Sequence, residues 1–190
     1  MFVRLTGCNL RCSWCDSEYT FTRGEHFDVE TVAQKAHAFG VHCVEVTGGE
    51  PLVQSAAVPL MERLLELGHE VLLETSGSRD ISVVPEPVHI ILDLKAPDSG
   101  EAKSNLWSNI AHLRPHHEVK FVVASRADYE WARDIIAEHD IAARCTVLLS
   151  PAWGLIAIDK LVDWMLEDAV PARLSLQIHK VIWGKDAVGV

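Results

Sequence analysis

Three cysteines near the start of the chain constrain its structure more than any other feature. Cys8, Cys12 and Cys15 form a Cys-x-x-x-Cys-x-x-Cys pattern, which brings three thiolates together in one loop. Three thiolates can ligate three of the four irons of a 4Fe–4S cubane, and the fourth iron then stays open to an exchangeable ligand. An open iron is what a cluster needs in order to do chemistry rather than only carry electrons. The sequence therefore predicts an enzyme built around an iron–sulfur cluster.

Two other uses of these cysteines stay open at this point. A zinc site would need a fourth ligand such as His26, yet structural zinc sites bring their ligands in pairs and no second cysteine pair follows. An electron carrier would supply a fourth cysteine. Cys43 and Cys145 instead lie in apolar, strand-like runs, which predicts buried structural thiols. With an odd total of five cysteines, a disulfide scaffold is a poor fit.

Composition limits the size and the partners of the fold. A chain of 190 residues with 48% hydrophobic content favours one domain over residues 1–190. The net charge of -10 disfavours a nucleic-acid partner, because affinity for phosphates rests on lysine and arginine. The chain has neither an apolar run of about 18 residues nor a basic-then-apolar leader. We therefore expect no membrane partner and a cytoplasmic location.

The hydrophobic pattern alternates between strands and helices. It predicts strands near 2–6, 42–47, 70–75, 88–94, 118–124, 144–149 and 173–178, and helices near 29–39, 56–67, 126–139 and 157–168. Asp28 and Ser125 are typical helix N-caps, and Gly40 and Gly68 stand where left-handed C-caps belong. Parallel strands joined by helices form a barrel or an open sheet, and ligands bind at the carboxyl ends of the strands.

A second motif falls at that edge, where a strand ends in Val46-Thr47-Gly48-Gly49-Glu50-Pro51. The two glycines permit a close backbone approach. An α-amino acid that chelated the open iron would need an acceptor for its ammonium group, and the Glu50 carboxylate with nearby backbone groups could provide it. Taken alone, the same turn is equally a plain strand-to-helix connection.

The cysteine pattern followed by Gly-Gly-Glu-Pro resembles the radical S-adenosylmethionine superfamily. Further stretches are similar to one family within it, the 7-carboxy-7-deazaguanine synthases, and lie at 4–17, 74–78, 93–101, 118–122 and 174–183. The resemblance therefore spans residues 2–190. The fold it implies is an α/β fold, a partial (β/α) barrel with mostly parallel strands.

The resemblance also implies an activity and its partners. A one-electron-reduced 4Fe–4S cluster would cleave S-adenosylmethionine to a 5'-deoxyadenosyl radical, which abstracts a hydrogen atom from C6 of the substrate. The substrate would be 6-carboxy-5,6,7,8-tetrahydropterin and the product 7-carboxy-7-deazaguanine, formed with loss of ammonia in queuosine and deazapurine biosynthesis. The resemblance further implies Mg2+, a one-electron reductant of the flavodoxin or ferredoxin type, and a homodimer.

Specific residues receive roles from the resemblance. Cys8, Cys12 and Cys15 would bind the cluster, and Ser17 would bind Mg2+ at a position where threonine is commoner. S-adenosylmethionine would contact residues of the cysteine loop and the strand ends, namely Trp14, Cys15, Asp16, Gly49, Ser76, Asp93, Leu94 and Lys95. The pterin would contact Arg4, Thr47 and Val190.

The chemistry of several of these residues suits the roles. The Arg4 guanidinium can form a two-pronged pair with a substrate carboxylate, and Asp93 and Lys95 can hold ribose hydroxyls or the cofactor carboxylate. Gln177 and His179 are predicted to share one face of the C-terminal strand. His179 could then serve the active site or be satisfied structurally.

The family pattern includes one segment that has no counterpart here. Members carry roughly twenty residues ahead of the position of Met1, about one strand and a loop, with a Gln-Gly-Glu-Gly-like stretch that helps to bind the substrate. Either the start of the chain was assigned too late or part of the pterin site is lost. Two alternative functions stay open: an activating enzyme for a glycyl-radical protein, and a non-catalytic, metal-stabilised binding module.

Overall fold

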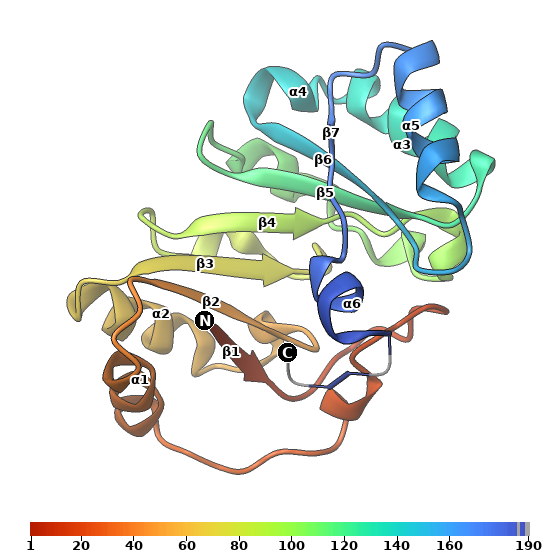
Figure 1. Cartoon of the computed structure of the whole chain (residues 1–190). Helices are drawn as coiled ribbons and strands as arrows, with labels where there is room; N and C mark the ends of the chain where they lie inside the picture. The colour runs from red at the N-terminus through yellow and green to blue at the C-terminus, as the bar shows by residue number, and fades with distance from the viewer. Residues whose placement is uncertain (186, 189–190) are drawn as a thin grey trace.

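The fold is one curved parallel sheet wrapped by helices. The computed structural model describes residues 1–185, 187 and 188. In these residues seven strands pair in their sequence order, and each neighbouring pair is parallel. Figure 1 shows β1 and β7 at the two edges of the sheet, so the barrel is open rather than closed.

The strands and helices have the following bounds. The strands are β1 (Phe2–Leu5), β2 (Cys43–Gly48), β3 (Glu70–Thr75), β4 (His89–Asp93), β5 (Glu118–Val123), β6 (Thr146–Pro151) and β7 (Arg173–Leu174). The α-helices are α1 (Val29–Ala38), α2 (Ala57–Glu66), α3 (Arg126–Glu138), α4 (Ile141–Arg144), α5 (Ile158–Glu167) and α6 (Ile178–Trp183). Short 3-10 helices span Glu18–Thr20, Pro51–Val53, Ile81–Val83, Pro97–Ser99, Ala102–Ser104 and Trp107–His112. None of the helices described is both long and apolar enough to cross a membrane.

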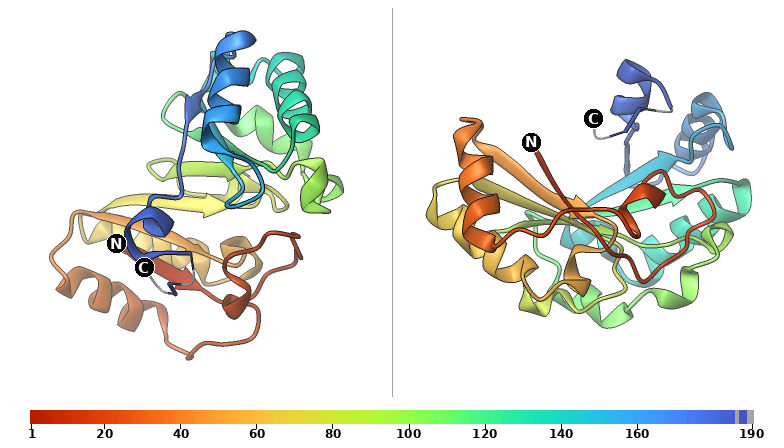
Figure 2. Two further views of the ribbon diagram at one scale, coloured as in Figure 1. Left: turned by 45° about the vertical axis from the view of Figure 1, so that its right-hand side comes forward. Right: turned by 90° about the horizontal axis from the view of Figure 1, so that it is seen from below.

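The two faces of the sheet differ in chemistry. Figure 2 shows a trough, with α2 and α3 on its convex side and α6 over its concave side. Strand alternation sends Val44 and Val46 into the core beneath α1 and α2, whereas Glu45 and Thr47 face the concave side. The apolar core therefore lies between sheet and helices, and the polar side chains collect inside the trough.

The predicted helix ends are confirmed. Asp28 Oδ1 accepts a hydrogen bond from the backbone N of Thr31 at 2.7 Å, and Ser125 Oγ accepts one from the N of Asp128 at 3.2 Å. Gly40 and Gly68 have φ angles of 68° and 85° directly after α1 and α2. Local sequence signals thus place these boundaries correctly.

The predicted C-terminal strand at 173–178 is wrong beyond its first two residues. β7 is Arg173–Leu174, and residues 178–183 form α6, so Gln177 and His179 do not share a strand face. Pairing with β6 ends when the N of Ser175 donates to the Leu149 carbonyl. The apolar run after that point resembles a strand in sequence, but among residues 1–185, 187 and 188 it pairs with no strand, and it turns back over the trough.

The turn after β2 generates a prediction about stability. A Cβ on Gly48 would lie 2.0 Å from the Leu5 carbonyl oxygen, and the φ of Gly48 is 143°. Gly48→Ala should therefore lower the free energy of unfolding by at least about 2 kcal/mol, from backbone strain and a steric clash. Urea denaturation of the metal-free protein measures this change.

Gly40→Ala is the matched control. Gly40 has a φ of 68° with nothing within 4 Å of an added Cβ, so its loss should be only about 1 kcal/mol from the left-handed backbone. Equal losses in the two variants would show that the contact with Leu5 is not tight.

Candidate active site

A cavity of about 460 Å³ lies on the concave side at the carboxyl ends of the strands. It gathers most of the residues predicted from the sequence, namely Arg4, Cys8, Cys12, Trp14, Cys15, Asp16, Ser17, Thr47, Gly49, Ser76, Asp93 and Lys95. Leu94 does not line it, because its side chain is fully buried in the core. Val190 lies outside the described residues.

The cysteine loop rests directly on the end of β2. A Cβ on Gly49 would lie 2.2 Å from the Gly7 carbonyl oxygen and 2.8 Å from Cys8 Cβ. The N of Glu50 donates to that same Gly7 carbonyl at 2.9 Å. Further along the loop, the N of Ser13 donates to the Ser99 carbonyl at 3.0 Å. Glycine at position 49 is therefore required for the loop to sit where it does.

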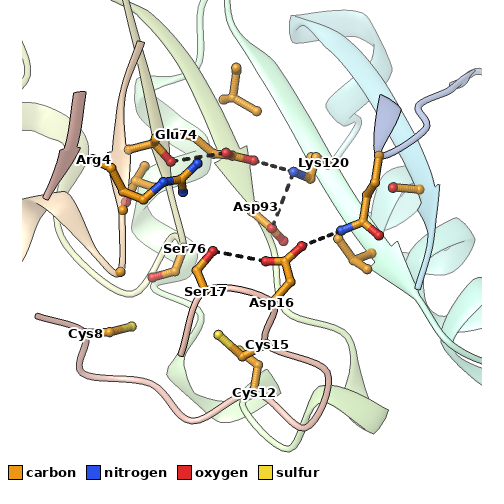
Figure 3. Close-up of a pocket in the computed structure, with 18 of the residues that line it drawn as sticks. Arg4, Cys8, Cys12, Cys15, Asp16, Ser17, Glu74, Ser76, Asp93 and Lys120 are labelled. Carbon is orange, nitrogen blue, oxygen red and sulfur yellow. Dashed lines mark hydrogen bonds and ion pairs between the residues drawn. The ribbon is translucent and has the colours of Figure 1, made fainter. Parts of the chain in front are cut away.

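The three cysteines of the loop all line the cavity. Figure 3 shows Cys8, Cys12 and Cys15 below Asp16 and Ser17. Burial raises the pKa of the Cys12 and Cys15 thiols, although the Lys95 charge opposes this at Cys12. Among the described residues, no three His, Cys, Asp or Glu side chains are grouped closely enough to hold one metal ion.

The prediction that Glu50 accepts a ligand ammonium is wrong. Glu50 is fully buried and does not line the cavity. Its carboxylate accepts hydrogen bonds from Thr75 Oγ1 at 2.8 Å, from both the N and the Oγ of Ser76 at 2.6 Å, and from the N of Leu52 at 2.9 Å. These four bonds use the carboxylate to join the ends of β2 and β3.

A network of charges crosses the cavity between β3, β4 and β5. Lys95 Nζ lies 3.1 Å from Asp93 Oδ2, and Lys120 lies 3.9 Å from the same oxygen while pairing with Glu74. Burial alone would lower the pKa of Lys120, but the charges of Glu74 and Asp93 raise it. Asp93 is 8% exposed, and its Oδ1 has no hydrogen-bond partner among the described residues. That buried oxygen is free to accept a hydrogen bond from a ligand.

Asp16 links the cysteine loop to α6. Its Oδ2 lies 2.9 Å from Lys180 Nζ and accepts a hydrogen bond from Gln177 Nε2 at 2.9 Å, while its Oδ1 accepts one from Ser17 Oγ at 3.1 Å. Burial would raise the pKa of Asp16, but the bond and charge of Lys180 lower it overall. Gln177 and His179 both line the cavity. Helix α6 is therefore held across the cavity by an ion pair with the loop that carries the cysteines.

Sequence reasoning gave no role to Glu45, Glu74, Lys120 or Lys180, which the structure brings into the site. Glu74 and Lys120 lie in stretches that resemble the family pattern, yet only their pairing across the sheet shows what they do. The signal that could have found them is a charged residue in an otherwise apolar strand, as in Val44-Glu45-Val46.

Comparison with known proteins shows the family. The sequence model of the radical SAM superfamily matches residues 2–99. A 7-carboxy-7-deazaguanine synthase of Koribacter versatilis is 44% identical over 207 residues, covering 100% of this chain and 91% of the relative. The chain belongs to the 7-carboxy-7-deazaguanine synthase family. A second family member, from Chlorobaculum tepidum, is 43% identical and covers 100% of this chain and 87% of its own length.

A solved structure confirms the predicted fold. Streptococcus suis SuiB bound to precursor peptide SuiA matches with a TM-score of 0.65 at 12% identity, over 93% of this chain and 48% of that one. At this identity the likeness shows the fold alone. It agrees with the partial (β/α) barrel expected for a 7-carboxy-7-deazaguanine synthase.

Family membership also confirms the predicted cofactors, a 4Fe–4S cluster, S-adenosylmethionine and Mg2+. The residues present fit these groups. Three soft thiols suit iron, and the hydroxyl of Ser17 suits a hard ion such as Mg2+. The free Oδ1 of Asp93 leaves an acceptor for a polar ligand.

Proposed function

We propose that this chain, acting as one radical S-adenosylmethionine core domain over residues 1–190, converts 6-carboxy-5,6,7,8-tetrahydropterin to 7-carboxy-7-deazaguanine with loss of ammonia. The observation that carries the proposal is 44% identity to a named 7-carboxy-7-deazaguanine synthase across the whole chain. The cavity that gathers the cysteines and the charged strand ends supports it. This function is favoured over a glycyl-radical activating enzyme or a non-catalytic binding module, because the family relatives carry a synthase name.

Each cofactor would be held by residues that line the cavity. Cys8, Cys12 and Cys15 would ligate three irons, and S-adenosylmethionine would contact the loop and strand-end residues Trp14, Cys15, Asp16, Gly49, Ser76, Asp93 and Lys95. When bound, these groups supply a 5'-deoxyadenosyl radical that takes one hydrogen atom from the substrate. Asp93 Oδ1 would accept a hydrogen bond from a ribose hydroxyl.

The substrate would occupy the part of the cavity between β1, β2 and β3. Arg4 faces this space beside Thr47, its register partner on β2. The Arg4 guanidinium would pair with the substrate carboxylate, and Thr47, whose hydroxyl donates to Glu74 at 3.3 Å, would position the ring. Val190 is also proposed to contact the substrate. Helix α6, held by Asp16, would exclude water from the bound substrate.

Replacing one cluster ligand tests the proposed function. The protein would be reconstituted anaerobically and incubated with dithionite, S-adenosylmethionine, Mg2+ and carboxytetrahydropterin. The wild type should yield 5'-deoxyadenosine and 7-carboxy-7-deazaguanine by mass spectrometry. Cys12→Ala should lose the visible absorption of the cluster and form neither product.

Cys43→Ala is the control, because Cys43 begins β2 and does not line the cavity. This variant should keep the cluster and both products. A Cys12→Ala protein that retained cluster and turnover would overturn the assignment of the ligands. Deoxyadenosine without the deazaguanine in the wild type would mean that the substrate is a different one.

Ser17 gives a prediction about Mg2+. The hydroxyl of Ser17 lies beside Asp16 at the edge of the cavity. Ser17→Ala should weaken the apparent Mg2+ affinity, measured from the rate at increasing Mg2+, by roughly tenfold or more. Ser17→Thr should keep the wild-type dependence because it keeps the hydroxyl. An unchanged Mg2+ response in Ser17→Ala would remove Ser17 from the metal site.

We further propose a homodimer that buries the outer face of α6. Ile178, Val181, Ile182 and Trp183 are each at least 57% exposed, an apolar group of the kind that a second copy covers. Val181→Glu should shift the protein from dimer to monomer in sedimentation velocity. Leu166→Glu, at an exposed apolar site on α5, should leave the dimer intact. A wild-type monomer would contradict the proposal.

The electron donor would be a flavodoxin or ferredoxin in the cytoplasm, where thiols stay reduced. The same turnover assay, with a reduced flavodoxin or ferredoxin in place of dithionite, tests this partner. Product formation only with dithionite would count against it.

A further inference from the structure

Glu45 is an acidic residue in the cavity to which no role has been given so far. It sits on β2, where the register places it between Phe2 on β1 and Leu72 on β3. Its side chain faces the cavity while Val44 and Val46 on either side enter the core. An acid with apolar neighbours on both adjacent strands is costly to keep ionised.

The nearest polar group is another acid. Glu74 lies two residues beyond Leu72 on β3, so it shares the cavity face of the sheet with Glu45 and is its diagonal neighbour across the strands. Glu74 is the ionised member of the pair, since it forms an ion pair with Lys120 and accepts a hydrogen bond from Thr47. The positive charges that face Glu45 are those of Lys120 and Arg4. Within the described part of the chain, however, no lysine or arginine nitrogen forms an ion pair with Glu45 within 4.0 Å.

Two neighbouring acids of which only one, Glu74, has an ion-pair partner repel each other when both are ionised. Burial and the negative charge of Glu74 raise the pKa of Glu45 to about 7, although Lys120 and Arg4 oppose the shift. The Lys120 charge lowers the pKa of Glu74. The proton of the pair therefore resides on Glu45, which loses it near neutral pH while Glu74 stays ionised.

A protonated carboxyl recognises a different ligand from an ionised one. A neutral acid offers an O–H donor beside a C=O acceptor, whereas a carboxylate offers acceptors alone. The donor and acceptor of a neutral acid match a cyclic amide, in which a ring carbonyl stands next to a ring N–H. The pyrimidine ring of the proposed pterin substrate carries this pair as its C4 oxo group and its N3–H.

We propose that Glu45 is a specificity-determining residue that keeps its proton, donates it in a hydrogen bond to the C4 oxo group of the substrate, and accepts one from N3–H. The inference rests on the proposed function for the identity of the ring. Ionised Glu74 holds the proton on Glu45 by repulsion. Loss of that proton would turn a matching donor into a second acceptor facing the oxo group.

Equilibrium binding of 6-carboxypterin tests the proposal without turnover, because this fluorescent ligand has the same pyrimidine edge and no hydrogen atom on C6. Its dissociation constant would be measured at pH 6 and pH 8 on the reconstituted enzyme with S-adenosylmethionine. A carboxyl with pKa of about 7 is mostly protonated at pH 6 and mostly ionised at pH 8. The dissociation constant of the wild type should therefore rise about tenfold from pH 6 to pH 8. This rise is counted after subtracting any change that Glu45→Gln shows over the same pH range.

Two variants and a control isolate Glu45. Glu45→Gln keeps a neutral donor and acceptor, so it should bind 6-carboxypterin at both pH values. Any change in its dissociation constant with pH measures the ionisation of the ligand itself. Glu45→Leu should bind weakly at both. Glu70→Gln, an exposed acid at the other end of β3, should follow the wild type.

Thermal unfolding at pH 4.5, pH 6 and pH 8 checks that the variants fold. The folded wild type holds the Glu45 proton up to about pH 7, while the unfolded chain releases it near 4.5. The stability of the wild type should therefore fall as the pH rises from 4.5 to about 7. Glu45→Gln should lack the contribution of Glu45 to this fall.

The outcomes separate this inference from the function on which it rests. If the wild type and Glu45→Gln show the same pH dependence of binding, or if Glu45→Leu binds as tightly as the wild type, the role of Glu45 is overturned and the synthase function stands. If the wild type binds no 6-carboxypterin at either pH, the proposed substrate class is overturned and the inference with it.

Discussion

The turn at Gly48, Gly49 and Glu50 joins three separate parts of the chain, and the site depends on it. Its backbone receives the cysteine loop, because the N of Glu50 donates to the Gly7 carbonyl and Gly49 has no side chain to push Cys8 away. Its buried carboxylate holds the end of β3 through Thr75 and Ser76. One turn thus sets the distance between the cysteines and the strand ends that face them.

The second constraint is the balance of charge inside the trough. The cavity carries more ionisable groups than an apolar pocket would, and most of them are paired, as Glu74 with Lys120 and Asp93 with Lys95. Paired charges keep fixed positions, so they can orient a polar ligand without large rearrangement. Glu45 is left outside these ion pairs, so its pKa is raised, whereas the charge of Lys120 lowers the pKa of Glu74.

Much of the fold could be predicted because it rests on local signals. Alternation of apolar residues located six strands, and caps such as Asp28 and Ser125 located helix starts. The C-terminal segment failed because Ile178, Val181 and Ile182 are equally typical of a strand and of a short helix. Which one forms depends on whether a neighbouring strand is present, and a sequence pattern does not contain that information.

The sequence by itself determined the cysteine loop, the parallel strands and the family, because thiolate spacing, hydrophobic period and the Gly-Gly-Glu-Pro turn are all encoded over short distances. Only the tertiary structure decided what the acids do. Glu50 was expected to face a ligand and is instead fully buried, while Glu45 and Glu74 meet across β2 and β3 from positions 29 residues apart. The pKa of a carboxyl depends on its burial and on the charges around it, and both are fixed only when distant segments pack together.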